Sequence, residues 1–387
     1  MRFKKQTALL LTTIMVLNIV LTGCGTGSTP TETSTGKTSG TSGGMTLEEY
    51  ALSVATPLSA EDAAINIEAK SSNPDKVIWK HANVTNNQTD SPSVRGDRQF
   101  FIELKKILGD KVEIQLFNGG VLGTTADQLL GGLQNRNFES CSYNVGAMAE
   151  YTNAFMPLDV MFLIPDLETA FKVVSGEPGE LMRQECIKDT GLNVLTMGAI
   201  GMRHITNGKR PITSVTDMKG LKIRVQNNPL HLLAFGALGC APTPIAYAEL
   251  FTSLQQGVVD GQENPIANIF AQNYVEVQKY MTLTEHLYTA GAFIVNDEWL
   301  KEQSPEFQQA VEKAAAIAQE YSGPELQKTE EALLKWITDK GMEVIELSDE
   351  AKAEFKEISM STWDEAAEKI GVDYFNSIRE SIEKISN

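Results

Sequence analysis

The chain has 387 residues, of which 42% are hydrophobic, and its formal net charge is −17 at pH 7. This length exceeds one typical domain, and the apolar content can fill one or two cores, so we expect two lobes or one large α/β unit. The acidic balance excludes nucleic acid and anionic lipid surfaces as partners, because both are bound by a basic face. An anionic small ligand stays compatible with it, since charges are screened over about 8 Å at physiological salt and two local arginines can dominate a pocket.

Residues 1–23 have the pattern of a bacterial lipoprotein signal peptide. Three basic residues precede an apolar run from Ala8 to Leu21, which is short for a bilayer span and ends in LTGC. This pattern predicts that Cys24 receives a diacylglyceryl group and becomes the mature N-terminus. A plain secretory signal and an uncleaved anchor are the alternatives, and in each case the rest of the chain is exported.

Residues 24–45 are expected to be the lipidated cysteine followed by a flexible tether. The run consists almost entirely of Gly, Ser and Thr, and such a composition cannot bury enough apolar surface to fold. A tether of about twenty residues holds the folded part within roughly 25 Å of the lipid. Residues 46–75 follow as an accessory segment, for which the sequence predicts one or two short helices and no role.

From Val77 onward the hydrophobic pattern is that of an α/β protein. Strands alternating with helices favour a parallel-rich sheet covered on both faces, with ligands beyond the carboxyl ends of the strands. Gly323-Pro324 is expected to kink or split the long helix near the C-terminus. The expected elements are strands at 77–83, 111–117, 138–144, 221–225, 292–296 and 342–345, helices at 93–108, 127–135, 247–256, 266–275 and 304–340, and C-terminal helices around Phe355, Trp363, Ile370 and Phe375.

The remaining cysteines are expected to be buried free thiols. Once Cys24 is lipidated, Cys141, Cys186 and Cys240 are left, and neither an odd number nor their spacing suggests a disulfide framework or a zinc site. One disulfide among the three stays open, because the chain is exported. The four histidines show no metal-ligand spacing, so we expect neither a metal nor a cofactor.

Arg224 is the candidate binding residue that the local pattern singles out. In DMKGLKIRVQN, at 217–227, the apolar residues alternate as in a strand, and Arg224 faces the side opposite to them. Its planar guanidinium matches a carboxylate with two parallel hydrogen bonds, which lysine cannot do. Taken alone, the run is more typical of an exposed strand arginine in an ordinary salt bridge.

Three ordered sequence blocks carry a family resemblance. They read RPITSVTDMKGLKIRVQNNP at 210–229, LGCAPTPIAYAELFTSLQQGVVDGQENP at 238–265 and YVEVQKYMTLTEH at 274–286. With these blocks the chain resembles the solute-binding proteins of tripartite ATP-independent periplasmic (TRAP) transporters, dicarboxylate-type branch, over roughly 77–387. The resemblance implies a two-lobed α/β fold, periplasmic-binding-protein-like (type II-like), with hinge strands and a long connecting helix. Lobe I would comprise 76–200 plus 290–325, and lobe II 201–289 plus 326–387.

The resemblance also implies a ligand site. Arg224 would clamp the substrate carboxylate, Arg203 in GMRHIT would be a second arginine of the site, and Asn264 of DGQENP would hydrogen-bond the same end of the ligand. The alternatives are a structural ion pair for Arg203, a helix N-cap for Asn264 and, for Glu263, a role in holding an arginine in position. The other implied contacts are Asn227 and Glu263 as polar neighbours, Tyr247 as an aromatic wall unless it is simply core, and Asn83, Thr125 and Asn144 from the first lobe.

The chain departs from the family pattern at several places, the Gly323-Pro324 break and the segment before Val77 among them, and none of these departures touches the arginine clamp. NNQTDSP after HANVT is longer than the usual link into the first helix, which makes the first-lobe contacts hard to place. Cys240 stands where a small residue such as alanine is usual.

The function that the resemblance implies is non-catalytic. The sequence has no G-x-S-x-G, H-E-x-x-H, phosphate-loop or G-x-G-x-x-G motif, which disfavours the rival reading as a surface hydrolase or an adhesin. We expect an extracytoplasmic, lipid-anchored, monomeric protein that binds a sugar acid, a dicarboxylate or a 2-oxo acid. It would deliver this organic acid to the small and large membrane subunits of a TRAP transporter. A binding protein for another transporter or a surface sensor is the alternative.

Overall fold

A computed structural model describes residues 58–85 and 92–386. The signal peptide, Cys24 and the tether lie outside the described residues. The strands are β1 (Val77–Asn83), β2 (Val112–Phe117), β3 (Ser140–Asn144), β4 (Leu192–Asn207), β5 (Lys222–Val225), β6 (Ala241–Pro244), β7 (Gly261–Pro265), β8 (Tyr280–Leu283), β9 (Tyr288–Asn296) and β10 (Glu343–Glu346).

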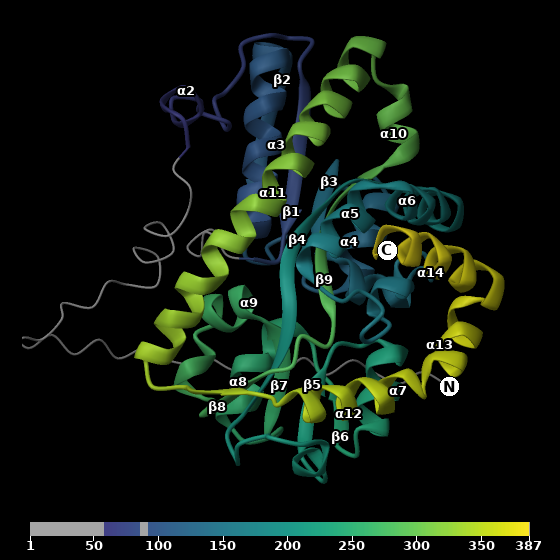
Figure 1. Cartoon of the computed structure of the whole chain (residues 1–387). Coiled ribbons are helices and arrows are strands. Elements are labelled where there is room, and N and C mark those ends of the chain that lie inside the picture. Colours follow the sequence, from purple (N-terminus) through teal and green to yellow (C-terminus); the bar gives the residue numbers. More distant parts are fainter. Residues whose placement is uncertain (1–57, 86–91, 387) are drawn as a thin grey trace, which may run out of the picture. The chain divides into compact units, whose positions relative to one another are not determined.

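Helices cover this sheet (Figure 1). They are α2 (Ala60–Ala63), α3 (Pro92–Leu108), α4 (Ala126–Gln134), α5 (Leu167–Ser175), α6 (Glu177–Thr190), α7 (Pro229–Ala237), α8 (Leu250–Gln255), α9 (Ile266–Ala271), α10 (Asp297–Glu302), α11 (Pro305–Asp339), α12 (Asp349–Met360), α13 (Trp363–Ile370) and α14 (Val372–Ser386). Short 3-10 helices span Gly109–Lys111, Val145–Glu150, Met156–Asp159, Val215–Met218, Tyr247–Glu249 and Tyr274–Glu276.

Strand β4 joins two halves of one mixed sheet. The order is β2-β1-β3-β9-β4-β7-β5-β6, with β8 paired to β4 and β10 to β8. The stretch 192–202 of β4 pairs antiparallel with β9, and 203–207 pairs antiparallel with β7 and β8. The pairs β1–β2, β1–β3, β5–β6, β5–β7 and β8–β10 are parallel. The predicted α/β class is confirmed, and the parallel pairing lies within each half, whereas β4 and β9 run antiparallel between them.

Helix α11 spans the two halves of the sheet. It packs against α3, β4 and α9, and Figure 1 shows it running along the sheet from α3 toward α9. The predicted split at Gly323-Pro324 is wrong, because α11 is one helix from Pro305 to Asp339. An interior proline costs about 3 kcal/mol. Packing against α3 at one end and α9 at the other outweighs that cost.

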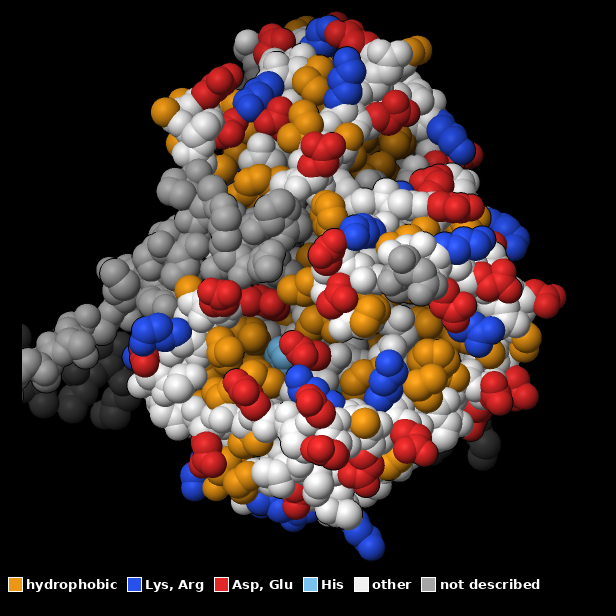
Figure 2. Space-filling view, viewed as in Figure 1, with side chains coloured by type: hydrophobic (Ala, Val, Ile, Leu, Met, Phe, Trp, Pro, Cys, Tyr) orange, Lys and Arg blue, Asp and Glu red, His pale blue; other side chains and the backbone are white. Residues whose placement is uncertain are grey.

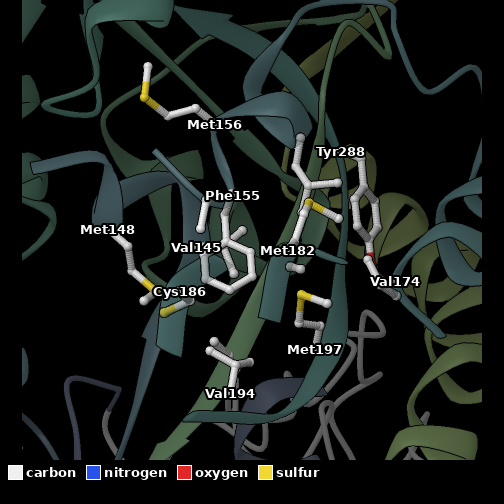
Figure 3. Packing of buried hydrophobic residues seen from close by; sticks show 14 of the residues in the cluster. Val145, Met148, Phe155, Met156, Val174, Met182, Cys186, Val194, Met197 and Tyr288 are labelled. Atoms are coloured by element: carbon white, nitrogen blue, oxygen red, sulfur yellow. The ribbon is translucent and has the colours of Figure 1, made fainter. Parts of the chain in front are cut away.

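The largest hydrophobic cluster packs α4, α5, α6 and α14 against β4 and β9. Figure 3 shows Met182 and Cys186 of α6 beside Val194 and Met197 of β4, with Tyr288 of β9 nearby. Because α14 packs against α5 and α6, the C-terminus lies on elements that the sequence assigned to the other lobe. The lobe boundaries themselves stay predictions.

The three described cysteines are buried and free, as predicted. Burial raises the pKa of Cys186 to about 11 and that of Cys240 to about 12. Such thiols are not thiolates at neutral pH and are therefore unreactive.

The accessory segment lies along the outer edge strand of the sheet. In residues 58–76, Lys70 forms an ion pair with Glu113 of β2 at 3.1 Å and lowers its pKa to about 2. The backbone N–H of Leu116 donates to the Glu68 carboxylate. An uncovered edge strand can pair with other chains, so this segment protects β2.

The described helices and the face shown in Figure 2 bear on the expectations for membrane and nucleic-acid partners. No helix of the described residues is long and apolar enough to cross a membrane. On the face shown in Figure 2, the Lys and Arg side chains are interspersed with Asp and Glu. Within the same residues, no group of three or more His, Cys, Asp or Glu could hold a metal ion.

A partly buried glutamate lies where α11 crosses β4. The β4–β9 register shifts between Ala199 and Gly201, and Gly201 has a φ of +134°. A Cβ at Gly201 would lie 2.5 Å from Oε1 of Glu330, so glycine is needed for this close approach. That oxygen is buried and has no hydrogen-bond partner among the described residues. Burial, with a further contribution from Glu285, raises the pKa of Glu330 to about 7.

We expect Glu330→Gln to remove a pH dependence of stability. Between the ordinary pKa of 4.5 and the folded-state value of about 7, the folded state holds a proton that the unfolded state releases, so the free energy of unfolding falls as pH rises through this window. At pH 8 the ionised group costs up to about 3 kcal/mol. Urea denaturation at pH 5 and pH 8 measures this loss, which the variant should lack. The exposed neighbour Glu331→Gln should behave like the wild type, and equal pH slopes for the wild type and Glu330→Gln would contradict the assignment.

Candidate ligand-binding site

A cavity of about 490 Å³ is lined by residues from both halves of the sheet. This volume is within the range of small-molecule sites. Asn83 and Asn144 are the last residues of β1 and β3, so the cavity adjoins the strand ends where the α/β pattern predicted a ligand. Seven of the nine predicted contact residues line it together: Asn83, Thr125, Asn144, Arg224, Asn227, Tyr247 and Asn264.

Arg224 presents a buried guanidinium to this cavity. Its neighbours Ile223 and Val225 point into the core of the opposite face, as the strand alternation predicted. Arg224 is 3% exposed, and its Nε donates to the carbonyl oxygen of Ile245 at 2.9 Å. No carboxylate of the described residues lies within 4.0 Å of it. Burial lowers the pKa of Arg224, yet an arginine stays protonated at neutral pH. A buried cation in this setting calls for an anion in the cavity.

Arg203 and Glu263 form a buried ion pair and do not line the cavity. Nε and Nη2 of Arg203 donate to the two carboxylate oxygens of Glu263, and Nη1 donates to Thr289 at 2.9 Å. Burial favours the neutral acid, but Arg203 holds the pKa of Glu263 well below its ordinary value. The alternative reading of both residues, a structural ion pair, therefore matches their placement. Direct ligand contact by either stays a prediction.

The ion pair orients Asn264 at the cavity wall. The Asn264 Oδ1 accepts from Arg203 Nη2 and from Asn268, each at 3.2 Å, and its Nδ2 donates to Gln262. One amide hydrogen of Asn264 is left for a ligand. The alternative N-cap role does not apply, since the N-cap of α9 is Pro265.

Two buried histidines complete this network. His231 lies between Asp159, at 3.1 Å, and Glu263, at 3.6 Å, and His286 approaches Glu263 at 3.4 Å. Burial opposes charge on the ring, but the hydrogen bond to Asp159 and the nearby charge of Glu263 raise the pKa of His231. Burial lowers the pKa of His286. A protonated His231 would balance the second carboxylate of the network, a role that the sequence did not suggest.

Several other predicted contacts also stabilise local turns. Asn144 Oδ1 accepts from the N–H of Gly146 at 2.8 Å and caps a 3-10 helix, and Thr125 caps α4. Asn227 donates to Glu150 at the cavity wall. Tyr247 is half-buried and lines the cavity. Asn144, Thr125 and Asn227 therefore combine a hydrogen bond within the fold with a place on the cavity wall.

Sequence reasoning missed Asp97. It lies on α3 and lines the cavity, and its carboxylate accepts from Asn83 at 2.7 Å, from Ser142 at 2.7 Å and from His81 at 3.3 Å. The sequence shows Asp97 only as a charged residue of the helix after β1, and such a residue is usually exposed to solvent.

The comparisons with known proteins agree with this geometry. The sequence model of the bacterial extracellular solute-binding proteins, family 7 (DctP), matches residues 84–370. The chain is 31% identical over 261 residues to the 2,3-diketo-L-gulonate-binding periplasmic protein YiaO of Escherichia coli K12, covering 67% of this chain and 78% of that protein. It is 28% identical over 295 residues to the C4-dicarboxylate-binding periplasmic protein DctP of Rhodobacter capsulatus, covering 75% and 87%.

Solved structures give the same assignment. The sugar acid binding protein DctPAm of Advenella mimigardefordensis, in complex with galactonate, aligns with a TM-score of 0.76 at 27% identity and covers 81% of this chain and 100% of that one. A TRAP periplasmic solute binding protein of Roseobacter denitrificans with bound β-D-glucuronate aligns with a TM-score of 0.73 at 26% identity, covering 79% and 99%. The predicted two-lobed fold is thereby confirmed. The chain belongs to the bacterial extracellular solute-binding proteins of family 7, whose members serve TRAP transporters outside the cytoplasm.

Proposed function

We propose that this protein captures an organic acid by pairing the ligand carboxylate with Arg224 and delivers it to the membrane subunits of a TRAP transporter. The observation that carries the proposal is the buried Arg224 guanidinium, which lines the cavity without a carboxylate partner among the described residues. In a water-poor cavity a charge-assisted, two-pronged hydrogen bond is stronger than in bulk water. The amide of Asn264, held by the buried ion pair, would bind the same carboxylate.

The two halves of the sheet would close around the ligand. β4 and β9 connect them, and the register shifts of β4 lie within the stretch that pairs with β9. Binding would favour a closed state, so the measured affinity includes the free energy of closing. The membrane subunits would then recognise the closed form.

Two further parts of the proposal follow from sequence and residue types. The chain acts as a receptor without catalysis. Cys24 anchors it to the outer face of the cell membrane through a lipid, at the end of the Gly, Ser and Thr-rich tether.

A thermal-shift screen of organic acids tests the proposal. We expect at least one aldonate, hexuronate, 2-oxo acid or C4-dicarboxylate to raise the melting temperature. A ligand at 100 times its dissociation constant stabilises the folded state by about 2.7 kcal/mol. Uncharged sugars of the same size serve as controls and should give no shift. A screen in which the uncharged sugars bind and no acid does would overturn the assignment.

A further inference from the structure

The charges of the cavity wall restrict the kind of acid that it can hold. Among the described residues that line the cavity, the charged ones are Arg224, Asp97 and Glu150. The single cation can pair one carboxylate. A second carboxylate would meet a wall that offers two anions and no further Lys, Arg or His, and like charges at short range cost free energy.

The carboxylate of Asp97 is built into this wall. Its side chain is 14% exposed, and no Lys or Arg of the described residues forms an ion pair with it. A nearly buried carboxylate without a cation is costly unless hydrogen bonds satisfy it. Asn83 from β1 and Ser142 from β3 supply two of these bonds, one to each carboxylate oxygen.

His81 supplies the third hydrogen bond to the Asp97 carboxylate. The indole N–H of Trp79 donates to Ser140 Oγ at 2.6 Å, because an indole is a donor only. The Ser140 hydroxyl hydrogen is then free for Nδ1 of His81, which lies at 2.8 Å. Nε2 of His81 faces the carboxylate and donates to Asp97 at 3.3 Å. A chain of bonds from the core thus fixes the orientation of the carboxylate.

An ionised carboxylate has about four acceptor positions, and the three protein donors leave about one for the cavity. The polar part of the surrounding wall includes amides and hydroxyls that both donate and accept, among them Asn83, Ser142, Asn144 and Thr125. Such groups match alcohol hydroxyls, which also do both. An ammonium group, by contrast, only donates, so it would leave the N–H donors of these amides unpaired.

We propose that the ligand is a polyhydroxylated monocarboxylate, whose carboxylate pairs with Arg224 and one of whose hydroxyl groups donates to Asp97. Asp97 is then the residue that selects sugar acids over dicarboxylates. This inference rests on the proposed function and adds the substrate class to it.

Isothermal titration calorimetry with matched probes tests the inference. The probes are a panel of C4 to C6 aldonates and hexuronates, among them D-galactonate, D-glucuronate and D-erythronate. Succinate, hexanoate and 6-aminohexanoate serve as comparison probes, and they replace the hydroxyl groups with a second carboxylate, with hydrocarbon or with an ammonium. At least one sugar acid should bind the wild type about thirtyfold or more tightly than each comparison probe.

Variants then locate the selectivity. Asp97→Asn should weaken binding of that sugar acid about tenfold to a hundredfold, because a hydrogen bond to a charged acceptor is lost. Asp75→Asn removes the same charge from an exposed position outside the cavity wall and should change nothing. If Asp97→Asn does not fold, the wild-type affinities for hexanoate, succinate and the sugar acids still test whether the site prefers sugar acids.

The two proposals fail in different ways. The role of Asp97 is overturned if succinate binds as tightly as the best sugar acid, or if a folded Asp97→Asn variant keeps its sugar-acid affinity. In that case the proposed receptor function still stands if an Arg224 variant loses binding of every acid. Tight binding of 6-aminohexanoate would also overturn the role of Asp97. If no acid of any class binds the wild type, both proposals fall.

Discussion

Replacing Arg224 with methionine should weaken binding of the preferred organic acid by about 2–5 kcal/mol, the usual penalty for truncating one partner of a buried charge pair. Methionine fills much of the space of the arginine stem, so the loss reports the guanidinium rather than a collapsed wall. The buried position of Arg224, at 3% exposure, leaves no bulk water to replace the lost bonds. Calorimetry on the wild type and the variant measures the difference directly.

Two companion variants separate charge from geometry. Arg224→Lys keeps the charge but loses the planar fork, so it should fall between the wild type and Arg224→Met. Arg210→Met removes the same charge from an exposed arginine whose guanidinium donates to the backbone oxygens of Asp217 and Lys219, and it should bind as the wild type does. Binding by a folded Arg224→Met within about threefold of wild type, under 1 kcal/mol, would show that the clamp assignment is wrong.

Local periodicity predicted several of the elements around the cavity. The strand predicted at 77–83 coincides with β1. Arg224 was placed correctly because a strand has period two, so the core residues Ile223 and Val225 fix its opposite direction. The bounds of α11 were predicted closely, but its continuity through Gly323-Pro324 was not. Tertiary contacts such as those with α3 and α9 influence whether a proline breaks a helix, and the sequence does not show them.

Long-range pairing was what the sequence could not supply. Asp97 belongs to the site because β1 and β3 bring His81, Asn83 and Ser142 to its carboxylate, and no local pattern encodes that meeting. Arg203 presents the opposite case. In the antiparallel register of β4 and β7, Arg203 lies opposite Pro265, two residues from Glu263. The Arg203 and Glu263 side chains therefore meet in a buried ion pair and do not line the cavity. Without this register, the sequence cannot distinguish an arginine that contacts the ligand from one that pairs with a neighbouring glutamate.

Glu263→Gln should lower the free energy of unfolding by about 3–5 kcal/mol at pH 7, because it leaves the Arg203 cation buried and unpaired. Both side chains are completely buried, so water cannot replace the lost carboxylate. Urea or guanidinium denaturation measures the change. Glu306→Gln breaks an exposed ion pair with Lys111, in which both side chains are more than half exposed, and should cost less than about 1 kcal/mol.

A double variant distinguishes an unpaired charge from lost packing. Arg203→Met combined with Glu263→Gln removes both charges, and replacing a buried ion pair by groups of similar volume is often close to neutral. The double variant should therefore recover more than half of the stability that Glu263→Gln loses. It should still bind the organic acid more weakly than the wild type, since Asn264 loses the Arg203 donor that orients it. A Glu263→Gln protein within 1 kcal/mol of wild type, or a double variant less stable than the single one, would mean that the ion pair does not stabilise this part of the fold.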